Sequence, residues 1–119
     1  MKIIDPHLHL FNLEQGEYQW LKADKPPFWP DKTTINKSFT EQSLKLSSPL
    51  SLTAFVHIEA GFDNQQPWRE LNYLQKCCQL PFTAVASIDL NLDNTSFSQQ
   101  LEKLTHQASF IGVRHILDE

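Results

Sequence analysis

The sequence has few of the residues that mark several common classes of protein. Its 119 residues include two cysteines, Cys77 and Cys78, whose adjacency suits neither a disulfide framework nor a CxxC metal-ligand pair. The three glycines, Gly16, Gly61 and Gly112, belong to no GxGxxG or GxxxxGK phosphate-binding motif. No apolar run reaches the roughly 18 residues that a membrane helix requires. These absences argue against disulfide scaffolds, nucleotide-cradling loops and transmembrane helices within the sequence.

Basic residues are also in short supply. Ten Lys and Arg against fourteen Asp and Glu give a net charge of −4 at pH 7, the wrong sign for a dedicated binder of nucleic acid or of anionic membranes. The apolar fraction of 40%, beside a charged fraction of 20%, is too high for a wholly disordered chain. The first residues, Met1–Asp5, contain no apolar signal-peptide core. We therefore expect a globular domain in the cytoplasm whose partners are neither nucleic acid nor membrane.

Strand-like and helix-like segments alternate along the chain. Strands are expected over residues 3–9, 52–59, 82–90 and 110–117, and helices over 39–46, behind Pro67, and from a capping-box pattern at Ser96. Residues 11–38 have no sustained period and are rich in prolines and aromatic residues, which predicts a long functional loop. Strands separated by helices imply right-handed crossovers. The predicted fold class is therefore α/β, built from parallel β/α units.

Each expected strand carries one aliphatic face and one face that becomes polar near its C-terminal end. In the second strand, Leu52, Ala54, Val56 and Ile58 alternate with Thr53, Phe55, His57 and Glu59. We expect the aliphatic face to pack against helices. The polar strand ends would gather at the edge where open α/β sheets and (β/α)₈ barrels place their chemistry.

The sharpest motif is His7-Leu8-His9 in the first strand. Residues i and i+2 of a strand point to the same side, so the two imidazoles can converge on one cation. Asp5 precedes them on the same face and is placed to orient a ring by a hydrogen bond. Two buried, hydrogen-bonded histidines would show the same spacing, so the pattern alone leaves both interpretations open.

Polar residues also close the later strands. His57 and Glu59 can supply ligands, a proton shuttle or a substrate contact; the alternatives are an ordinary salt bridge or a core histidine with its hydrogen bonds satisfied. Arg114 can hold an anionic or carbonyl oxygen through forked hydrogen bonds, or pair with Asp89 or Glu59. Asp89 itself can be an acid, an orienting partner or a turn cap. Arg114 and His115 are neighbours, so both can face one site only if the strand ends between them.

Four short sequence motifs, spread along the whole chain, are informative when they are taken together and in their order. They are Ile3-Ile4-Asp5-Pro6-His7-Leu8-His9-Leu10-Phe11, Glu17-Tyr18-Gln19-Trp20-Leu21, Val56-His57-Ile58-Glu59-Ala60 and Phe110-Ile111-Gly112-Val113-Arg114-His115. Together they resemble the amidohydrolase superfamily of metal-dependent TIM-barrel hydrolases, and within it the amidohydrolase-2 branch. That branch includes sugar-acid lactonases and 2-pyrone-4,6-dicarboxylate lactonase, and it more often has glutamine where His57 stands. Each motif is weak alone, whereas the set is specific to the branch.

The resemblance implies a hydrolase that opens a lactone of a small sugar acid or related carboxylate by activated water. His7 and His9 match the metal pair of the first strand. The implied cofactor is a divalent metal, with zinc first among the candidates, although some members of the branch work without metal. The metal or an arginine would polarise the carbonyl, and a carboxylate would activate the water.

The resemblance also assigns the remaining site residues. Glu59, Arg114 and His115 match catalytic positions, with Arg114 in contact with the substrate carbonyl or carboxylate. The substrate-binding residues would be Trp20, His57 and Asp89, with Trp20 and the long first loop roofing the site.

The chain departs from the family in length. A (β/α)₈ barrel takes about 250 residues, and these 119 match its first four strands and the helices between them. We expect residues 1–119 to be the N-terminal half of such a barrel, without the last-strand aspartate that usually accepts the proton. Such a half exposes sheet edges, so we expect it to aggregate, to form a homodimer or to depend on a C-terminal half-barrel, and to be weakly active or inactive.

Other interpretations stay open at this point. TatD-like metal-dependent nucleases also begin with a His-x-His strand, although the acidic balance and the Tyr-Trp loop weigh against them. A non-catalytic remnant would bind a metal or a partner chain through its open sheet edges. A flavodoxin-like sheet fits the alternation of strands and helices but would need a phosphate-binding loop after the first strand, which the sequence lacks.

Overall fold

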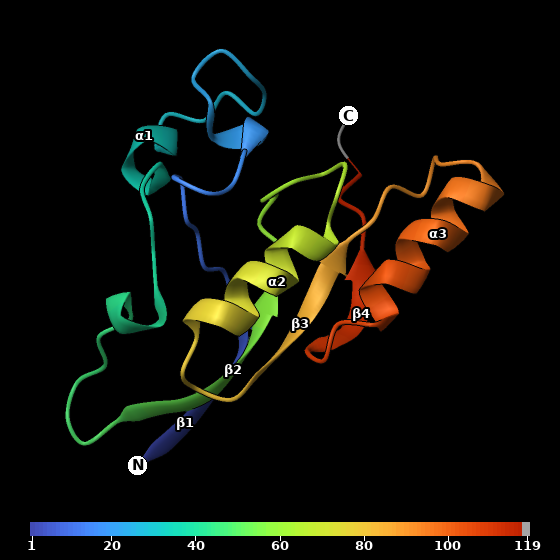
Figure 1. Cartoon of the computed structure of the whole chain (residues 1–119). Helices are drawn as coiled ribbons and strands as arrows, with labels where there is room; N and C mark the ends of the chain where they lie inside the picture. The colour runs from blue at the N-terminus through green and yellow to red at the C-terminus, as the bar shows by residue number, and fades with distance from the viewer. Residues whose placement is uncertain (118–119) are drawn as a thin grey trace.

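The protein is described here by a computed structural model, which covers residues 1–117. Its strands are β1 (Lys2–Leu8), β2 (Ser51–Ile58), β3 (Phe82–Ser87) and β4 (Phe110–Arg114). Its helices and helical turns are η1 (Gln19–Leu21), α1 (Lys32–Ile35), η2 (Glu41–Ser43), α2 (Trp68–Cys77) and α3 (Asn94–Thr105). The strands form one four-stranded sheet in the order β1-β2-β3-β4, and every pair is parallel (Figure 1). The predicted α/β class and parallel β/α units are confirmed.

The strand order places the connections on one side of the sheet. Each right-handed crossover moves to the next strand in the same direction, so α2 and α3 lie over the same face (Figure 1). The β1–β2 connection joins that side, because Ile35 and Phe39 pack into the same cluster as Leu74 of α2. A flavodoxin-like sheet reverses its order beside the first strand, and this sheet does not.

The helix-covered face holds the apolar core. Phe55 of β2 stacks on Phe82 of β3, with ring centroids 5.3 Å apart. Beside them, the small Ala84 of β3 lets two helices approach closely, so that Leu71 of α2 and Leu104 of α3 are completely buried. Burial of each leucine contributes about 1.5–3 kcal/mol, which is enough to fix both helices on this face.

The prediction that the aliphatic face of the second strand packs against helices is wrong for β2. Phe55 and His57 face α2, whereas Ala54 and Val56 lie on the opposite face and are only half-buried. The phenyl ring of Phe55 buries more apolar surface than Ala54 or Val56, so it takes the covered side. The opposite face, which we call the open face, is covered by no helix within residues 1–117.

Two helix starts differ from the sequence-based expectation. The helix expected over 39–46 is only the turn η2, which Thr40 and Ser43 close with a reciprocal capping box. Helix α3 begins at Asn94 rather than at Ser96, because the carboxylate of Asp93 caps it. Asp93 accepts hydrogen bonds from the backbone N–H of Ser96 at 2.8 Å and from its hydroxyl at 2.9 Å.

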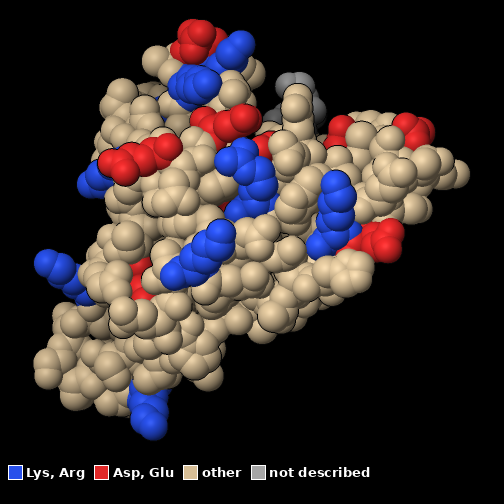
Figure 2. Space-filling view, viewed as in Figure 1, with Lys and Arg blue, Asp and Glu red and all other residues tan. Residues whose placement is uncertain are grey.

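The surface carries both signs of charge. Lysines and arginines are interspersed with acidic residues over the helix-covered side that Figure 2 shows, and neither sign forms a continuous patch there. Within residues 1–117, no helix is both long and apolar enough to cross a bilayer.

Candidate functional site

A cavity of about 970 Å³ opens between the carboxyl ends of the strands and the long loop after β1. Its volume lies at the upper end of the range for small-molecule sites. One wall is apolar and largely aromatic, and consists of Phe11, Trp20, Pro27, Trp29, Ile35 and Phe39. The facing wall is polar, and consists chiefly of His9, Glu59, Asn64, Gln65, Ser87, Asp89, Asn91, Arg114 and His115. Five residues predicted for the site therefore share this polar wall, and Trp20 stands across from them.

Glu59 and Arg114 form the charged centre of the polar wall. Arg114 Nε donates to Glu59 Oε1 at 2.7 Å, and Arg114 Nη2 donates to the Glu59 carbonyl at 3.2 Å. Glu59 Oε2 accepts from the backbone N–H of Gly61 at 3.2 Å, so both carboxylate oxygens are engaged. Of the two partners that the sequence offered Arg114, the structure selects Glu59. Arg114 Nη1 makes no hydrogen bond within residues 1–117.

His115 stands beside this pair. Strand β4 ends at Arg114, so the chain turns and both neighbours line the cavity, as the sequence required for a shared site. The backbone N–H of Leu90 donates to His115 Nδ1 at 3.0 Å, so the proton of the neutral ring belongs on Nε2. Asp89 Oδ1 lies 3.9 Å from the same Nδ1 and accepts from the backbone N–H of Asn91 at 2.8 Å, as a turn cap does.

The two first-strand histidines converge as their spacing predicts. His7 Nε2 and His9 Nε2 are 3.1 Å apart. His9 Nδ1 lies 2.8 Å from the carbonyl oxygen of Ile58 and donates to it, which leaves the lone pair of His9 Nε2 directed at His7. The orienting partner is therefore the Ile58 carbonyl and not Asp5, whose carboxylate accepts from the backbone N–H of His7 at 2.9 Å.

The spacing of this histidine pair fits a tetrahedral metal, and the tautomer of His9 leaves its Nε2 lone pair available for one. Nitrogens that bind one zinc ion at about 2.0–2.1 Å lie about 3.3 Å from each other, close to the observed separation. Burial lowers the pKa of His9, and although the hydrogen bond to the Ile58 carbonyl acts in the opposite direction, the neighbouring His7 and Arg114 lower it further, which favours the neutral ring that metal binding needs. Within residues 1–117, no group of three or more His, Cys, Asp or Glu side chains is arranged around a metal position.

Trp20 is held over the cavity by the residues that follow β2. Its indole Nε1–H donates to the Ala60 carbonyl at 2.7 Å. Gly61 has φ +75°, and a Cβ atom built there would lie 2.8 Å from Trp20 Cδ1. Only glycine satisfies both the backbone angle and the indole's close approach. The strand-end segment that supplies Glu59 therefore also positions the aromatic wall.

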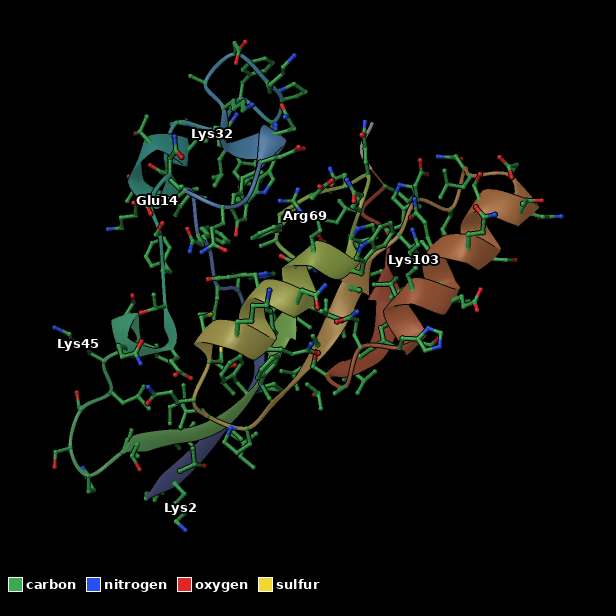
Figure 3. All side chains as sticks on the ribbon, in the orientation of Figure 1. Lys2, Glu14, Lys32, Lys45, Arg69 and Lys103 are labelled. Atoms are coloured by element: carbon green, nitrogen blue, oxygen red, sulfur yellow. The ribbon has the colours of Figure 1, made fainter. Side chains whose placement is uncertain are left out.

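The loop bearing Trp29 is tied together by a buried lysine. Lys32, labelled on α1 in Figure 3, donates from Nζ to the carbonyl of Lys22 at 2.7 Å and to that of Lys25 at 2.5 Å. Its side chain is buried, and its ammonium lies 5.7 Å from the centroid of the Phe28 ring. We call residues 22–32 the aromatic flap, because its Trp29 ring reaches Trp20 with centroids 6.2 Å apart.

The structure does not bring His57 to the cavity. Its side chain is completely buried between the sheet and α2, with Nε2 3.3 Å from Glu70 Oε2 but outside hydrogen-bond geometry. His57 Nδ1 accepts from the backbone N–H of Leu10 at 3.3 Å, and Glu70 Oε2 accepts from that of Ala60 at 2.9 Å. This buried pair therefore holds the two chain segments that carry His9 and Glu59.

Sequence reasoning missed Glu70 and several cavity residues. Glu70 lies next to Leu71 and four residues before Leu74, within the buried stripe of α2. A carboxylate in such a stripe is the signal that a buried partner exists. Asn64, Gln65 and Asn91 lie in the loops after β2 and β3, and no periodicity marks them.

Comparison with known proteins gives one relative for this chain. The uncharacterized protein y4mH of Sinorhizobium fredii (strain NBRC 101917 / NGR234) is 32% identical over 121 residues. The alignment covers 98% of this chain and 40% of the relative, so the chain spans less than half of that protein's length. No family model matches the chain, and no solved structure matches it.

Proposed function

We propose that this chain carries the substrate-binding and metal-binding half of a hydrolase that opens a small lactone bearing a carboxylate. The observation that supports the proposal most is the meeting of His9, Glu59, Arg114 and His115 in one cavity at the carboxyl ends of parallel strands. Parallel β/α proteins place their chemistry at that end, because the loops there converge. The sequence resemblance to the amidohydrolase-2 branch supplies the reaction class.

Under this proposal the polar wall binds the acyl end of the substrate. Arg114 Nη1 and the Nε2–H of His115 are donors on the same wall, suited to a carboxylate or a carbonyl oxygen. Glu59 fixes the guanidinium through Nε and Nη2 and so keeps Nη1 turned to the ligand. Donors fixed in advance stabilise the developing oxyanion without reorganising during the reaction. His115 Nε2–H can also donate a hydrogen bond that stabilises the leaving alkoxide, whose proton would come from the attacking water.

The aromatic wall suits the ring of the substrate. Phe11, Trp20 and Trp29 present ring faces and edges to the cavity, with the Phe11 and Trp20 centroids 5.8 Å apart. A flat pyrone or the C–H face of a sugar lactone packs against such rings. The wall and the flap also exclude water from the carbonyl, which strengthens every charged contact there.

His7 and His9 are the residues that would hold a divalent metal, with zinc favoured by two imidazole ligands. When bound, the metal supplies a polarised, readily deprotonated water. The Ile58 carbonyl sets the tautomer of His9. His9 is the member of the histidine pair that belongs to the polar wall of the cavity. The remaining ligands and the general base would come from a further half of the domain.

The finer fold assignment belongs to the same proposal. Sequential parallel strands with all helices on one face form the geometry of a (β/α)₈ barrel wall, and the open face would then line the barrel interior. Because the chain spans 40% of its relative, the complete reaction is proposed for a longer assembly, and this chain alone would bind substrate with little turnover.

Ligand and metal binding by the purified chain test the proposal. We expect calorimetry to show binding of a sugar-acid γ-lactone and of its hydroxy acid, with at least 10-fold weaker binding in Arg114→Gln. Lys103→Gln on α3 makes the same charge change far from the cavity and is the matched control. Cobalt titration should show a His7→Ala-sensitive site, with exposed His106→Ala as its control.

The outcomes separate the competing functions. Lactone or hydroxy-acid binding that depends on Arg114 supports the hydrolase. Cleavage of DNA in place of lactone binding would indicate the nuclease. A chain that binds neither metal nor any of these ligands would favour a non-catalytic remnant, and the hydrolase proposal would then be withdrawn.

A further inference from the structure

One side chain holds the aromatic flap, residues 22–32, in its shape. Lys32 Nζ donates to the carbonyl oxygens of Lys22 and Lys25, and it also lies against the ring of Phe28. Its contacts thus reach three points in the first half of the flap. Within residues 1–117, residues 22–28 make no other hydrogen bond to the second half of the flap. The folded shape of the flap therefore depends on the Lys32 side chain.

The ammonium group of Lys32 is buried without a carboxylate partner. Lys32 is 5% exposed, and no carboxylate in the described part of the chain lies within 4.0 Å of its Nζ. A buried cation is costly unless hydrogen bonds replace those that it made with water. The two flap carbonyls supply such bonds, and bonds from a charged donor are about twice as strong as neutral ones. Lys32 and the folded flap consequently stabilise each other.

Trp29 depends on the flap for its position in the cavity. Its side chain is 55% exposed, so packing against the core contributes little to holding it. Its backbone carbonyl accepts from the backbone N–H of Lys32 at 3.3 Å. Its ring meets that of Trp20 at an angle of 62°, and both rings line the cavity. Lys32 therefore determines where the Trp29 ring stands on the aromatic wall.

The two walls of the cavity would contact different parts of a ligand. Arg114 and His115 would bind the acyl oxygens, which a lactone and its hydroxy acid both have. Trp20 and Trp29 would contact the carbon skeleton. A closed ring presents one rigid face to these rings, whereas an open chain must lose freedom of rotation to pack against them. The aromatic contact should therefore favour the lactone over the product of its hydrolysis.

We infer that Lys32 is a positioning residue, which holds Trp29 against the closed ring of a lactone and so makes the cavity bind the lactone in preference to its open-chain hydroxy acid. The inference rests on the proposed function, which supplies the lactone as ligand. The contacts that carry it join residues 22–32 to each other and to Trp20.

Calorimetry with D-galactono-γ-lactone and D-galactonate as probes tests the inference. We expect Lys32→Met to bind the lactone about 10-fold more weakly and the hydroxy acid within about 2-fold of the unaltered chain, because only the lactone depends on Trp29. Lys45→Met removes the same charge from an exposed side chain away from the flap and should change neither affinity (Figure 3). Circular dichroism shows whether each variant folds.

A double variant separates action through Trp29 from a general loss of structure. Trp29→Leu should show the same selective loss of lactone binding as Lys32→Met. Lys32→Met/Trp29→Leu should then bind the lactone no more weakly than Trp29→Leu alone, because Lys32 acts through the ring that is already missing. Losses that add would overturn the inference.

Tryptophan quenching by acrylamide gives a reading on the unaltered chain, and it decides the matter if Lys32→Met does not fold. At saturation the lactone should protect the tryptophans more than the hydroxy acid does. Equal protection by the two probes, or an equal loss of both affinities in Lys32→Met, would overturn the inference and leave the proposed function standing. Failure of the unaltered chain to bind either probe would overturn both.

Discussion

Arg114 Nε donates to Glu59 Oε1 at 2.7 Å and joins the ends of β4 and β2 across a sequence separation of 55 residues. The carboxylate side chain is 7% exposed and the guanidinium 33% exposed. The ion pair is therefore partly buried, and its contribution to the free energy of unfolding is expected to lie between that of a surface pair and that of a buried pair.

We expect Arg114→Gln to lower the free energy of unfolding by about 1–2 kcal/mol, because Glu59 would be left nearly buried without its charged partner. Urea denaturation of the single variants and of Glu59→Gln/Arg114→Gln measures the coupling. The double variant should be more stable than the sum of the two single effects implies. Strict additivity would show that the pair makes no net interaction.

The buried pair of His57 and Glu70 leads to a second expectation. His57→Leu removes the acceptor for the Leu10 N–H, so it should cost about 1–3 kcal/mol and reduce cobalt affinity 10- to 100-fold through the adjoining His9. His57→Gln retains a side-chain acceptor and should recover most of both losses. Equal cobalt affinity in the two variants would show that His57 does not position His9.

Gly61 is the glycine whose replacement should matter most. Gly61→Ala forces a side chain into φ +75° and against the Trp20 indole, so we expect a loss of about 1–2 kcal/mol and a shift in tryptophan emission. Gly112→Ala is the control, because a Cβ there meets nothing within 4 Å. Matching unfolding midpoints for the two variants would contradict this account of the Trp20 wall.

Asp63 is expected to make the free energy of unfolding depend on pH in the acid range. Burial alone would raise the pKa of its carboxyl, but the backbone N–H of Gln66, the Arg69 guanidinium and the backbone N–H of Gln65 outweigh burial and lower the pKa. Since the folded pKa lies below the unfolded value of 3.8, the stabilisation is present above that pH and is lost as pH falls through the folded pKa.

Asp63→Asn should accordingly be less stable than the unaltered chain near neutral pH, by about 2 kcal/mol. The difference should shrink below about pH 4, where the unaltered carboxyl also becomes neutral. Thermal unfolding from pH 2 to 7 measures it. A gap of constant size across that range would mean that the charge of Asp63 contributes nothing.

The sequence allowed the sheet and half of the site geometry to be predicted, because both depend on local spacing. The i, i+2 rule brought His7 and His9 together, and the alternation of strands and helices gave the parallel sheet. The neighbouring Arg114 and His115 were expected to share a site only at a strand end, and β4 ends between them. Each of these results follows from a few adjacent residues.

The predictions that were wrong concern contacts between residues that are distant in sequence. The sequence predicts His57 as a cavity residue because it lies two positions before Glu59 on the same strand face, yet Glu70 of α2 and the Leu10 N–H hold it inside the core. The covered face of β2 was set by the stacking of Phe55 on Phe82, which lies on another strand. No pattern within one strand reveals which of its faces a neighbouring helix will cover.

The sequential strand order has a consequence for synthesis and ancestry. Each strand pairs with the one made just before it, so the sheet can grow from its N-terminal edge while the ribosome is still adding residues. Growth from one edge also means that a new β/α unit can be appended beside β4 without disturbing the earlier pairs. Tandem duplication of the coding segment would therefore lengthen the sheet by whole units, a simple genetic route from four strands to eight.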